Sequence, residues 1–380
     1  MKFVLFCHSL LSDWNHGNAH FLRGVVRELQ ARGHAVDVYE PRGGWSRANL
    51  VADHGPEAVE ATRAAFPDLS STEYDPDRLD LDRALDGADV VLVHEWTDPA
   101  LVARLNRRRA AGGRFRLLFH DTHHRAATDP AAMAAYALDA FDGVLAFGAV
   151  LRDLYRRRGW ARRAWVWHEA ADTTVFRPLP DRPREGDLVW VGNWGDGERT
   201  AELETFLLGP VRALGLTARA HGVRFPPAGR YAFAAAGIAC AGRLPNHEVP
   251  EVFARYGATV HVPRRPYAAA LPGIPTIRVF EALACGIPLV CAPWHDAEGL
   301  FRPGRDYLVA RDGDDMARHL RAVLSDPDLA AALRTNGLAA IRERHTCRHR
   351  VDQLLALCAG LGAADGAFEQ TPAAAAQRGT

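Results

Sequence analysis

The stretch from Leu271 to Trp294, LPGIPTIRVFEALACGIPLVCAPW, constrains the fold more than any other part of the chain. Thr276 is a suitable N-cap for a helix whose apolar residues recur at helical spacing, and Gly286 followed by Pro288 predicts where that helix ends. The apolar run PLVCA that follows is typical of a buried parallel strand. The stretch therefore predicts a loop, a helix and a strand of an α/β domain.

The start of this helix suits a phosphate group. A helix N-terminus has unpaired N–H groups and about half a positive charge, and Arg278 in the first turn would add to it. Glu281 lies about 7 Å along the helix axis, where a carboxylate could accept hydrogen bonds from ribose hydroxyls. The loop that would receive the phosphate consists of Gly273, Ile274, Pro275 and Thr276. An exposed Arg278–Glu281 ion pair, three residues apart, is the alternative explanation.

The segment RVFEALACGIPLV resembles the donor-site helix of GT-B glycosyltransferases, and the fuller run resembles their CgeB-like branch (spore maturation protein type), related to the retaining family four. The resemblance implies an α/β fold of two Rossmann-like, doubly wound domains that face each other across a cleft. It also implies that Glu281 binds the ribose of a sugar nucleotide. Family four has a second acidic residue eight positions earlier, where this chain has Gly273, so the donor sugar and retention of configuration stay open.

The length of 380 residues suits two domains. We expect an N-terminal acceptor domain at 1–180 and a donor domain at 181–345, joined by the proline-rich segment PLPDRPREGD. The resemblance implies that a last helix, at 346–360, crosses back to the first domain. The alanine- and glycine-rich residues 361–380 are expected to be disordered.

Composition excludes some partners. Lys plus Arg (46) balance Asp plus Glu (46), so no overall field attracts the protein to nucleic acid or to a membrane surface. Six scattered cysteines without a C-x-x-C pair predict buried thiols in a reducing cytosol. The run MKFVLFCHSLL predicts a first strand instead of a signal peptide, and no apolar run reaches the length of a membrane span. A cytoplasmic location is predicted, with a peripheral position at the inner membrane face left open.

The N-terminus predicts a βαβ unit. A strand at 2–7, the loop HSLLSDWNHGN, an amphipathic helix and the strand AVDVYEP follow one another, with the loop at the carboxyl end of the first strand, where doubly wound sheets bind ligands. The loop lacks G-x-G-x-x-G, so a nicotinamide site is not expected. The resemblance places Gly17 and Asn18 near the donor phosphates and the acceptor, although Gly17 could simply permit a turn.

Two further predicted strands each end in a histidine beside a carboxylate: His94 with Glu95, and His120 with Asp121. Polar groups at the carboxyl ends of parallel strands face the crevice. The segment HDTHHR at 120–125 has three interpretations, namely a metal site, a structural histidine cluster, or contact with sugar or acceptor. The resemblance favours His120 as the histidine that contacts the transferred sugar, with His94 as the second choice, and predicts no metal.

The resemblance predicts further donor contacts in the second half of the chain. Three residues follow its first strand, and the backbone of two residues after a later strand reads the nucleobase. Separately from the resemblance, an arginine in the loop just before the central stretch is a further candidate for the diphosphate because of its position. In that order, these residues are Gly192, Asn193, Trp194, Arg243, Leu244 and Arg264.

Together these features predict a metal-independent glycosyltransferase, hexosyltransferase-like and with retention of configuration favoured, that needs no cofactor. It would move a sugar from a nucleoside-diphosphate sugar, with a UDP-sugar favoured, to a hydroxyl of a glycan, lipid-linked intermediate, protein or metabolite. Arg278 would stabilise the leaving group, and a retaining enzyme needs no separate base. An inverting one would use a base, for which the candidates are His120, Asp121, His94 and Asp13. The alternatives are a sugar-nucleotide epimerase, a non-catalytic nucleotide-sugar-binding protein and a metal-dependent hydrolase.

Overall fold

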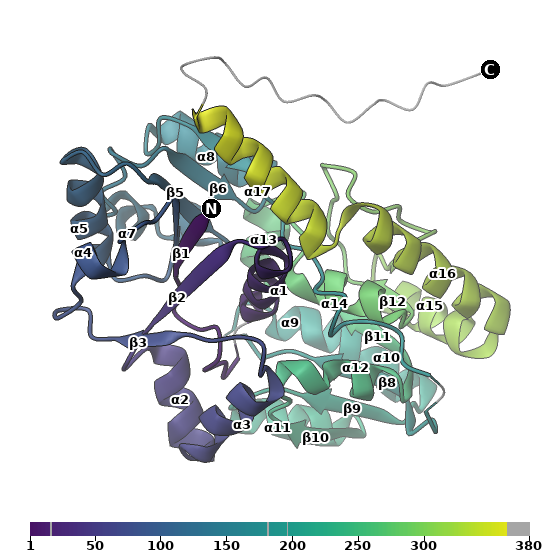
Figure 1. Cartoon of the computed structure of the whole chain (residues 1–380). Coiled ribbons are helices and arrows are strands. Elements are labelled where there is room, and N and C mark those ends of the chain that lie inside the picture. Colours follow the sequence, from purple (N-terminus) through teal and green to yellow (C-terminus); the bar gives the residue numbers. More distant parts are fainter. Residues whose placement is uncertain (16, 181, 196, 363–380) are drawn as a thin grey trace, which may run out of the picture.

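The computed structural model describes residues 1–15, 17–180, 182–195 and 197–362. It shows two domains, each built on a parallel β-sheet with helices packed against it (Figure 1). The predicted disordered tail at 361–380 lies outside the described residues except for its first two positions. Within these ranges, no helix is long and apolar enough to cross a membrane.

The first domain has a seven-stranded sheet in the order β3-β2-β1-β4-β5-β6-β7, with every neighbouring pair parallel. From β1, the chain adds β2 and β3 on one side of the sheet and then β4 to β7 on the other side. The loop after β1 begins at this switch point, where doubly wound sheets bind ligands. The strands are β1 Lys2–Phe6, β2 Ala35–Pro41, β3 Thr72–Tyr74, β4 Val90–His94, β5 Arg116–Asp121, β6 Gly143–Ala146 and β7 Ala164–Val166.

Helices connect these strands. The first of them, α1, follows the loop after β1 and buries a continuous apolar face, as its sequence periodicity predicts. The helices of this domain are α1 Asn18–Ala31, α2 Trp45–His54, α3 Glu57–Ala65, α4 Leu81–Ala84, α5 Pro99–Ala110, α6 Arg125–Thr128, α7 Pro130–Ala134 and α8 Ala149–Arg158.

The second domain repeats this plan with a six-stranded sheet in the order β10-β9-β8-β11-β12-β13, again parallel throughout. Strand β9 therefore lies between β8 and β10. The strands are β8 Gly186–Val191, β9 Ala218–His221, β10 Ile238–Gly242, β11 Tyr256–His261, β12 Leu289–Cys291 and β13 Leu308–Val309.

The helices of the second domain and the closing helix complete the fold. They are α9 Thr200–Leu203, the π-turn η1 Glu204–Leu208, α10 Gly209–Leu214, α11 Pro227–Ala235, the 3-10 turn η2 Asn246–Glu248, α12 Val249–Phe253, α13 Arg265–Ala270, α14 Ile277–Cys285, α15 Gly313–Ser325, α16 Pro327–Arg344 and α17 Cys347–Gly362.

The central stretch folds as a loop, a helix and a strand, as its sequence predicts. Helix α14 starts after Thr276 and stops at Gly286, whose φ of 68° is left-handed and favours glycine. Thr276 is the N-cap residue, as predicted, but its side chain does not cap the helix, because its hydroxyl makes a hydrogen bond of 2.9 Å with Nε2 of His261. Strand β12 follows and is fully buried.

Helix α14 lies against the first domain as well as its own. Ile277 and Phe280 of α14 share one buried apolar cluster with Phe21 and Val25 of α1. Helix α17 joins the same cluster and runs along the first domain in Figure 1, with an ion pair of 2.6 Å between Arg32 and Asp352. The two domains are thus packed together around α1, α14 and α17.

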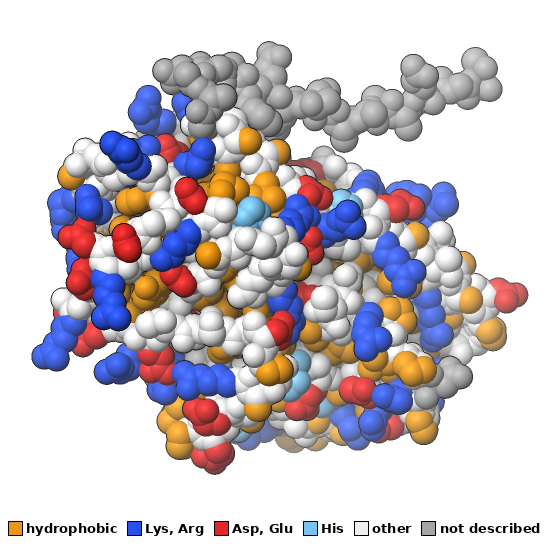
Figure 2. Space-filling view, in the orientation of Figure 1, with side chains coloured by type: hydrophobic (Ala, Val, Ile, Leu, Met, Phe, Trp, Pro, Cys, Tyr) orange, Lys and Arg blue, Asp and Glu red, His pale blue; other side chains and the backbone are white. Residues whose placement is uncertain are grey.

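Charged side chains are mixed on the surface. On the face shown in Figure 2, basic and acidic groups are interspersed. This distribution fits the equal counts of basic and acidic residues, 46 each, and that face presents no broad basic patch of the kind that steers nucleic acid.

Candidate donor site

A pocket lies between the two domains, at the carboxyl ends of their strands. It is small, with about 30 Å³ open to the centre of a water-sized molecule. Its walls come from the loop after β1, the ends of β8, β9 and β10, and α14. The predicted site residues that line it are Gly17, Gly192, Arg243, Leu244 and Arg278.

Other predicted donor residues lie around this pocket without lining it. The Asn18 amide donates to the Thr122 hydroxyl. The Trp194 indole N–H donates to Thr200 over 3.1 Å, and the Arg264 guanidinium pairs with Glu198 over 3.2 Å. Asn193, next to the pocket residue Gly192, accepts hydrogen bonds from Arg199 at its backbone carbonyl.

The loop before α14 also lies outside the pocket lining. Gly273 has a φ of 91°, and its N–H donates to the His295 carbonyl over 2.7 Å. Ile274 is buried in an apolar cluster that otherwise consists almost wholly of first-domain residues. Together with Pro275 and Thr276, this loop therefore supports the domain interface.

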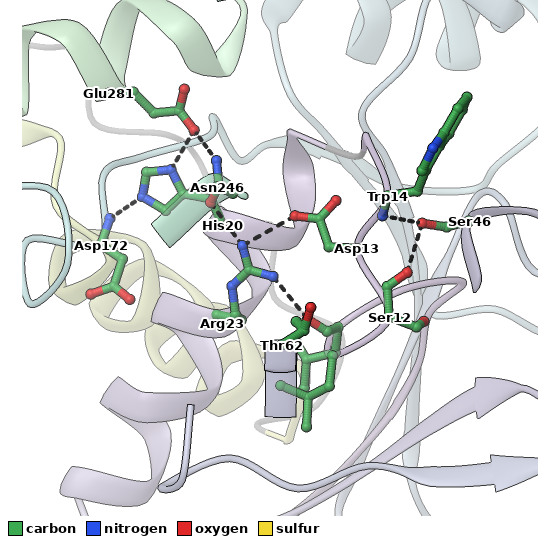
Figure 3. A network of polar contacts seen from close by, with 12 residues as sticks. Ser12, Asp13, Trp14, His20, Arg23, Ser46, Thr62, Asp172, Asn246 and Glu281 are labelled. Carbon is green, nitrogen blue, oxygen red and sulfur yellow. Dashed lines mark hydrogen bonds and ion pairs between the residues drawn. The ribbon is translucent and has the colours of Figure 1, made fainter. Parts of the chain in front are cut away.

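Glu281 lies directly behind the pocket and joins the two domains. Its side chain is 0% exposed, and its Oε1 accepts hydrogen bonds from His20 Nδ1 over 3.0 Å and from Asn246 Nδ2 over 2.8 Å (Figure 3). Its Oε2 accepts a hydrogen bond from Arg278. The Arg278–Glu281 ion pair of the alternative explanation therefore forms, but its placement on an exposed surface is wrong, because Glu281 is 0% exposed.

The contacts of His20 fix its protonation. The backbone N–H of Asp172 donates to His20 Nε2 over 2.7 Å, so this nitrogen is unprotonated and Nδ1 carries the proton given to Glu281. Burial by itself would raise the pKa of Glu281, but the Arg278 charge and the hydrogen bonds from His20 and Asn246 hold it below its usual value. Glu281 is therefore an ionised carboxylate at neutral pH.

The network continues toward the first loop. Arg23 of α1 donates to Asn246 Oδ1 over 2.7 Å and pairs with Asp13 over 3.4 Å (Figure 3). Asp13 and Asn246 both line the pocket. A polar chain that crosses the domain interface thus connects the pocket to Glu281.

Glu169 lies at the start of α14 and had no signal in the sequence. It follows β7 in the first domain and is 2% exposed, and the backbone N–H of Ile277 is close enough to lower its pKa. Its Oε1 has no hydrogen-bond partner among the described residues. A carboxylate of the first domain therefore lies beside the helix N-terminus that the sequence predicts for a phosphate.

Glu169 predicts a pH effect on stability. Burial raises its pKa well above the usual value, and the Glu281 charge adds to this effect while Arg278 opposes it. The folded protein then binds the proton more tightly than the unfolded chain, so this group lowers stability as pH rises above about 4.3 toward the folded-state pKa. In thermal unfolding, the melting temperature of Glu169→Gln relative to that of wild type should therefore be higher at pH 8 than at pH 5. A difference that is the same at both pH values would contradict this.

The predicted catalytic histidines lie deeper than expected. His94 is 2% exposed and its Nε2 contacts the Thr122 hydroxyl over 3.1 Å. His120 is 0% exposed, has no hydrogen-bond partner on either ring nitrogen among the described residues, and packs edge-on against Trp167. Burial lowers the pKa of His120 to about 3, so it stays neutral. Neither residue lines the pocket.

Asp121 is also fully buried and hydrogen-bonded. It accepts from the Tyr155 hydroxyl over 2.8 Å and from the His123 N–H over 3.1 Å, and burial raises its pKa to about 6. His123 and His124 pack against Tyr267 of the second domain. In the described part of the chain, no group of three or more His, Cys, Asp or Glu side chains is arranged to hold a metal ion.

Part of the sequence matches a family of known proteins. Residues 199–356 match the glycosyl transferase-like family. No curated protein matches the sequence significantly.

Solved structures match over nearly the whole chain. Sucrose-phosphate synthase from Thermosynechococcus elongatus is 16% identical with a TM-score of 0.64, covering 96% of this chain and 100% of that one. HepE from Anabaena in complex with UDP-glucose is 13% identical with a TM-score of 0.65, covering 95% and 100%. An alpha-glucosyltransferase in complex with UDP-glucose and DNA is 12% identical with a TM-score of 0.68, covering 94% and 99%.

The predicted fold class is therefore confirmed. The chain has the GT-B fold of glycosyltransferases, with two doubly wound domains, and its second domain is similar in sequence to glycosyl transferase-like proteins. These matches do not test membership of the CgeB-like branch, which stays a prediction.

Proposed function

We propose that the protein is a glycosyltransferase that moves a hexose from a UDP-sugar to a hydroxyl acceptor, without a metal ion and with retention of configuration. The observation that carries this proposal is the pocket between the domains, which brings together Gly17, Gly192, Arg243, Leu244 and Arg278 from distant parts of the sequence. HepE and the alpha-glucosyltransferase, both similar in fold, were solved with UDP-glucose, which favours this donor.

The pocket walls suggest how the donor lies. The ends of β9 and β10, with Leu244 and Arg243, would hold the base. Asn246, with Glu281 behind it, would face the ribose, and Arg278 would face the diphosphate. Direct contact between Glu281 and the ribose requires the side chains that cover this carboxylate to move, because Glu281 is 0% exposed and is enclosed by its donors His20, Asn246 and Arg278. In this proposal, donor binding therefore loosens the domain interface.

The leaving diphosphate develops negative charge in the transition state. Arg278, which lines the pocket in the first turn of α14, would stabilise that charge. For a retaining reaction, the departing phosphate oxygen takes the acceptor proton. The complete burial of His120 and Asp121 supports this route, since neither side chain lines the pocket. If the reaction inverts, Asp13 is the base favoured by its position in the pocket wall.

The branch and location belong to the same proposal. We place the protein in the CgeB-like branch, based on the resemblance of the α14 segment, and in the cytoplasm, based on the cysteine pattern. The acceptor class stays open among glycans, lipid-linked intermediates, proteins and metabolites.

A thermal-shift panel tests the proposal. UDP, GDP, TDP and their hexose conjugates are added separately to the wild-type chain. UDP and UDP-hexose should raise the melting temperature most, because ligand binding to the native state alone stabilises it. No shift with any of these compounds would contradict the proposed function.

Independence from metal ions is a separate prediction. Once a donor and acceptor are found, transfer should proceed at the same rate after treatment with EDTA, because Arg278 takes the role that a divalent cation has in other enzymes. Loss of transfer that Mg²⁺ or Mn²⁺ restores would contradict this and would revive the metal-dependent alternative.

A non-catalytic nucleotide-sugar-binding protein is the second candidate, favoured by the glycine at position 273. Its φ of 91° strains any side chain, and a Cβ there would lie 3.3 Å from the Glu298 side chain, so the acidic residue of family four does not fit without rearrangement. Such a protein would bind UDP-sugar but neither transfer nor epimerise it. Chromatography of UDP-sugar incubated with and without acceptors separates these outcomes.

A further inference from the structure

His221 is a buried residue in the pocket wall that no contact explains. It ends β9, lines the pocket and is 6% exposed. Neither ring nitrogen has a hydrogen-bond partner among the described residues. Because buried polar side-chain atoms are nearly always paired, this unpaired imidazole at the wall of a pocket is a candidate for pairing with a bound ligand.

The backbone around His221 is fixed by its neighbours. Its carbonyl accepts a hydrogen bond of 2.9 Å from the N–H of Gly192, and the N–H of Gly222 donates to the Gly242 carbonyl over 2.8 Å. Strand β9 lies between β8 and β10, so His221 lies between the glycine after β8 and the residues after β10. The residue thus lines the pocket from backbone that is fixed at the carboxyl end of the sheet.

We propose that His221 binds the nucleoside part of the donor and donates a hydrogen bond to its base. This inference rests on the proposed function and assigns a residue that recognises the donor nucleotide. The position supports the nucleoside end, because Val223 and Leu244 form apolar wall nearby, whereas Arg278, the candidate for the diphosphate, belongs to α14.

The charge of His221 fits the same role. Burial lowers its pKa to about 4, with a further contribution from Arg219, so the ring is neutral at physiological pH. A neutral imidazole can donate from one nitrogen and accept at the other, which suits the carbonyl and N–H groups of a base. It has no charge to attract a phosphate, in contrast to Arg278.

His221→Leu tests the inference in the full-length protein. The substitution removes both nitrogens and keeps a side chain of buried type. Calorimetry with UDP and with uridine should show the same loss of affinity for both ligands, about three- to tenfold, as expected for one hydrogen bond. The melting temperature without ligand should stay the same or rise, because an unpaired buried polar group is replaced by an apolar one.

Two further variants serve as controls. His221→Gln, which keeps a donor and an acceptor, should recover part of the affinity. Arg278→Ala should weaken the binding of UDP more than the binding of uridine, in contrast to the equal loss expected for His221→Leu. A loss in His221→Leu confined to UDP, or no loss, would overturn the inference. So would a melting temperature several degrees lower in both His221 variants. If wild type binds no nucleotide, the proposed function and this inference fall together; if wild type binds and His221→Leu binds equally well, only the inference falls.

Discussion

Replacing Glu281 by alanine is expected to weaken UDP binding by about ten- to a hundredfold, the scale of one charge-assisted hydrogen bond. The same change should lower the free energy of unfolding by about 3 kcal/mol, because it leaves His20 and Asn246 without their shared acceptor in the domain interface. This is the low end for breaking a buried ion pair, since the Arg278 side chain is 26% exposed and can be hydrated. Calorimetry and urea unfolding measure the two effects.

Glu281→Gln is the matched control. It keeps an oxygen acceptor for His20 or Asn246 but removes the charge, so it should lose less stability than Glu281→Ala while still binding UDP more weakly than wild type. Unchanged UDP affinity in a folded Glu281→Ala variant would remove the ribose assignment. Unchanged stability would contradict the interdomain role of the carboxylate.

The second large effect is expected from Arg278→Ala, which should lower kcat by about a hundred- to a thousandfold, the cost of removing one donor from a developing negative charge. The loss of UDP affinity should be smaller than the loss of turnover, because the leaving-group charge is greatest in the transition state. Steady-state kinetics and calorimetry on the same preparation compare the two.

Arg278→Lys separates charge from geometry. Lysine keeps the positive charge but not the planar guanidinium that bonds Glu281, so turnover should be partly restored while stability stays below that of wild type. An equal loss of affinity for UDP and uridine in Arg278→Ala would argue against contact with the diphosphate. In that case Arg278 would act only by holding Glu281.

Local sequence signals predicted the fold well. The helix over Ile277–Cys285, its stop at Gly286 and the buried strand after it follow from spacing and backbone preference, which depend on near neighbours. The βαβ pattern at the N-terminus likewise placed the first loop at the switch point of the sheet. These features determine the GT-B architecture.

The partners of the site residues could not be predicted in the same way. Glu281 meets His20, which is 261 positions away in the sequence, and Glu169 reaches the start of α14 from the first domain. Helical spacing placed Glu281 off the apolar face, yet α14 is buried on nearly every side because α1 covers it. Such contacts depend on how the domains pack.

The rule about strand ends was only partly sufficient. It placed His94 and His120 at the correct end of the sheet but did not predict how deeply their side chains are buried. Neither of them lines the pocket. The same rule applied to β9 would have identified His221. The difference between these histidines is what packs over them, such as Trp167 over His120, and a single sequence does not show this.

The central claim is that the pocket between the domains holds a nucleoside diphosphate, with Arg278 at the phosphates. A crystal structure of the protein with UDP tests it most directly. We predict the base beside His221 and Leu244, the ribose beside Asn246, and the diphosphate beside Arg278 at the start of α14. UDP bound elsewhere on the protein, with this pocket empty, would contradict the account.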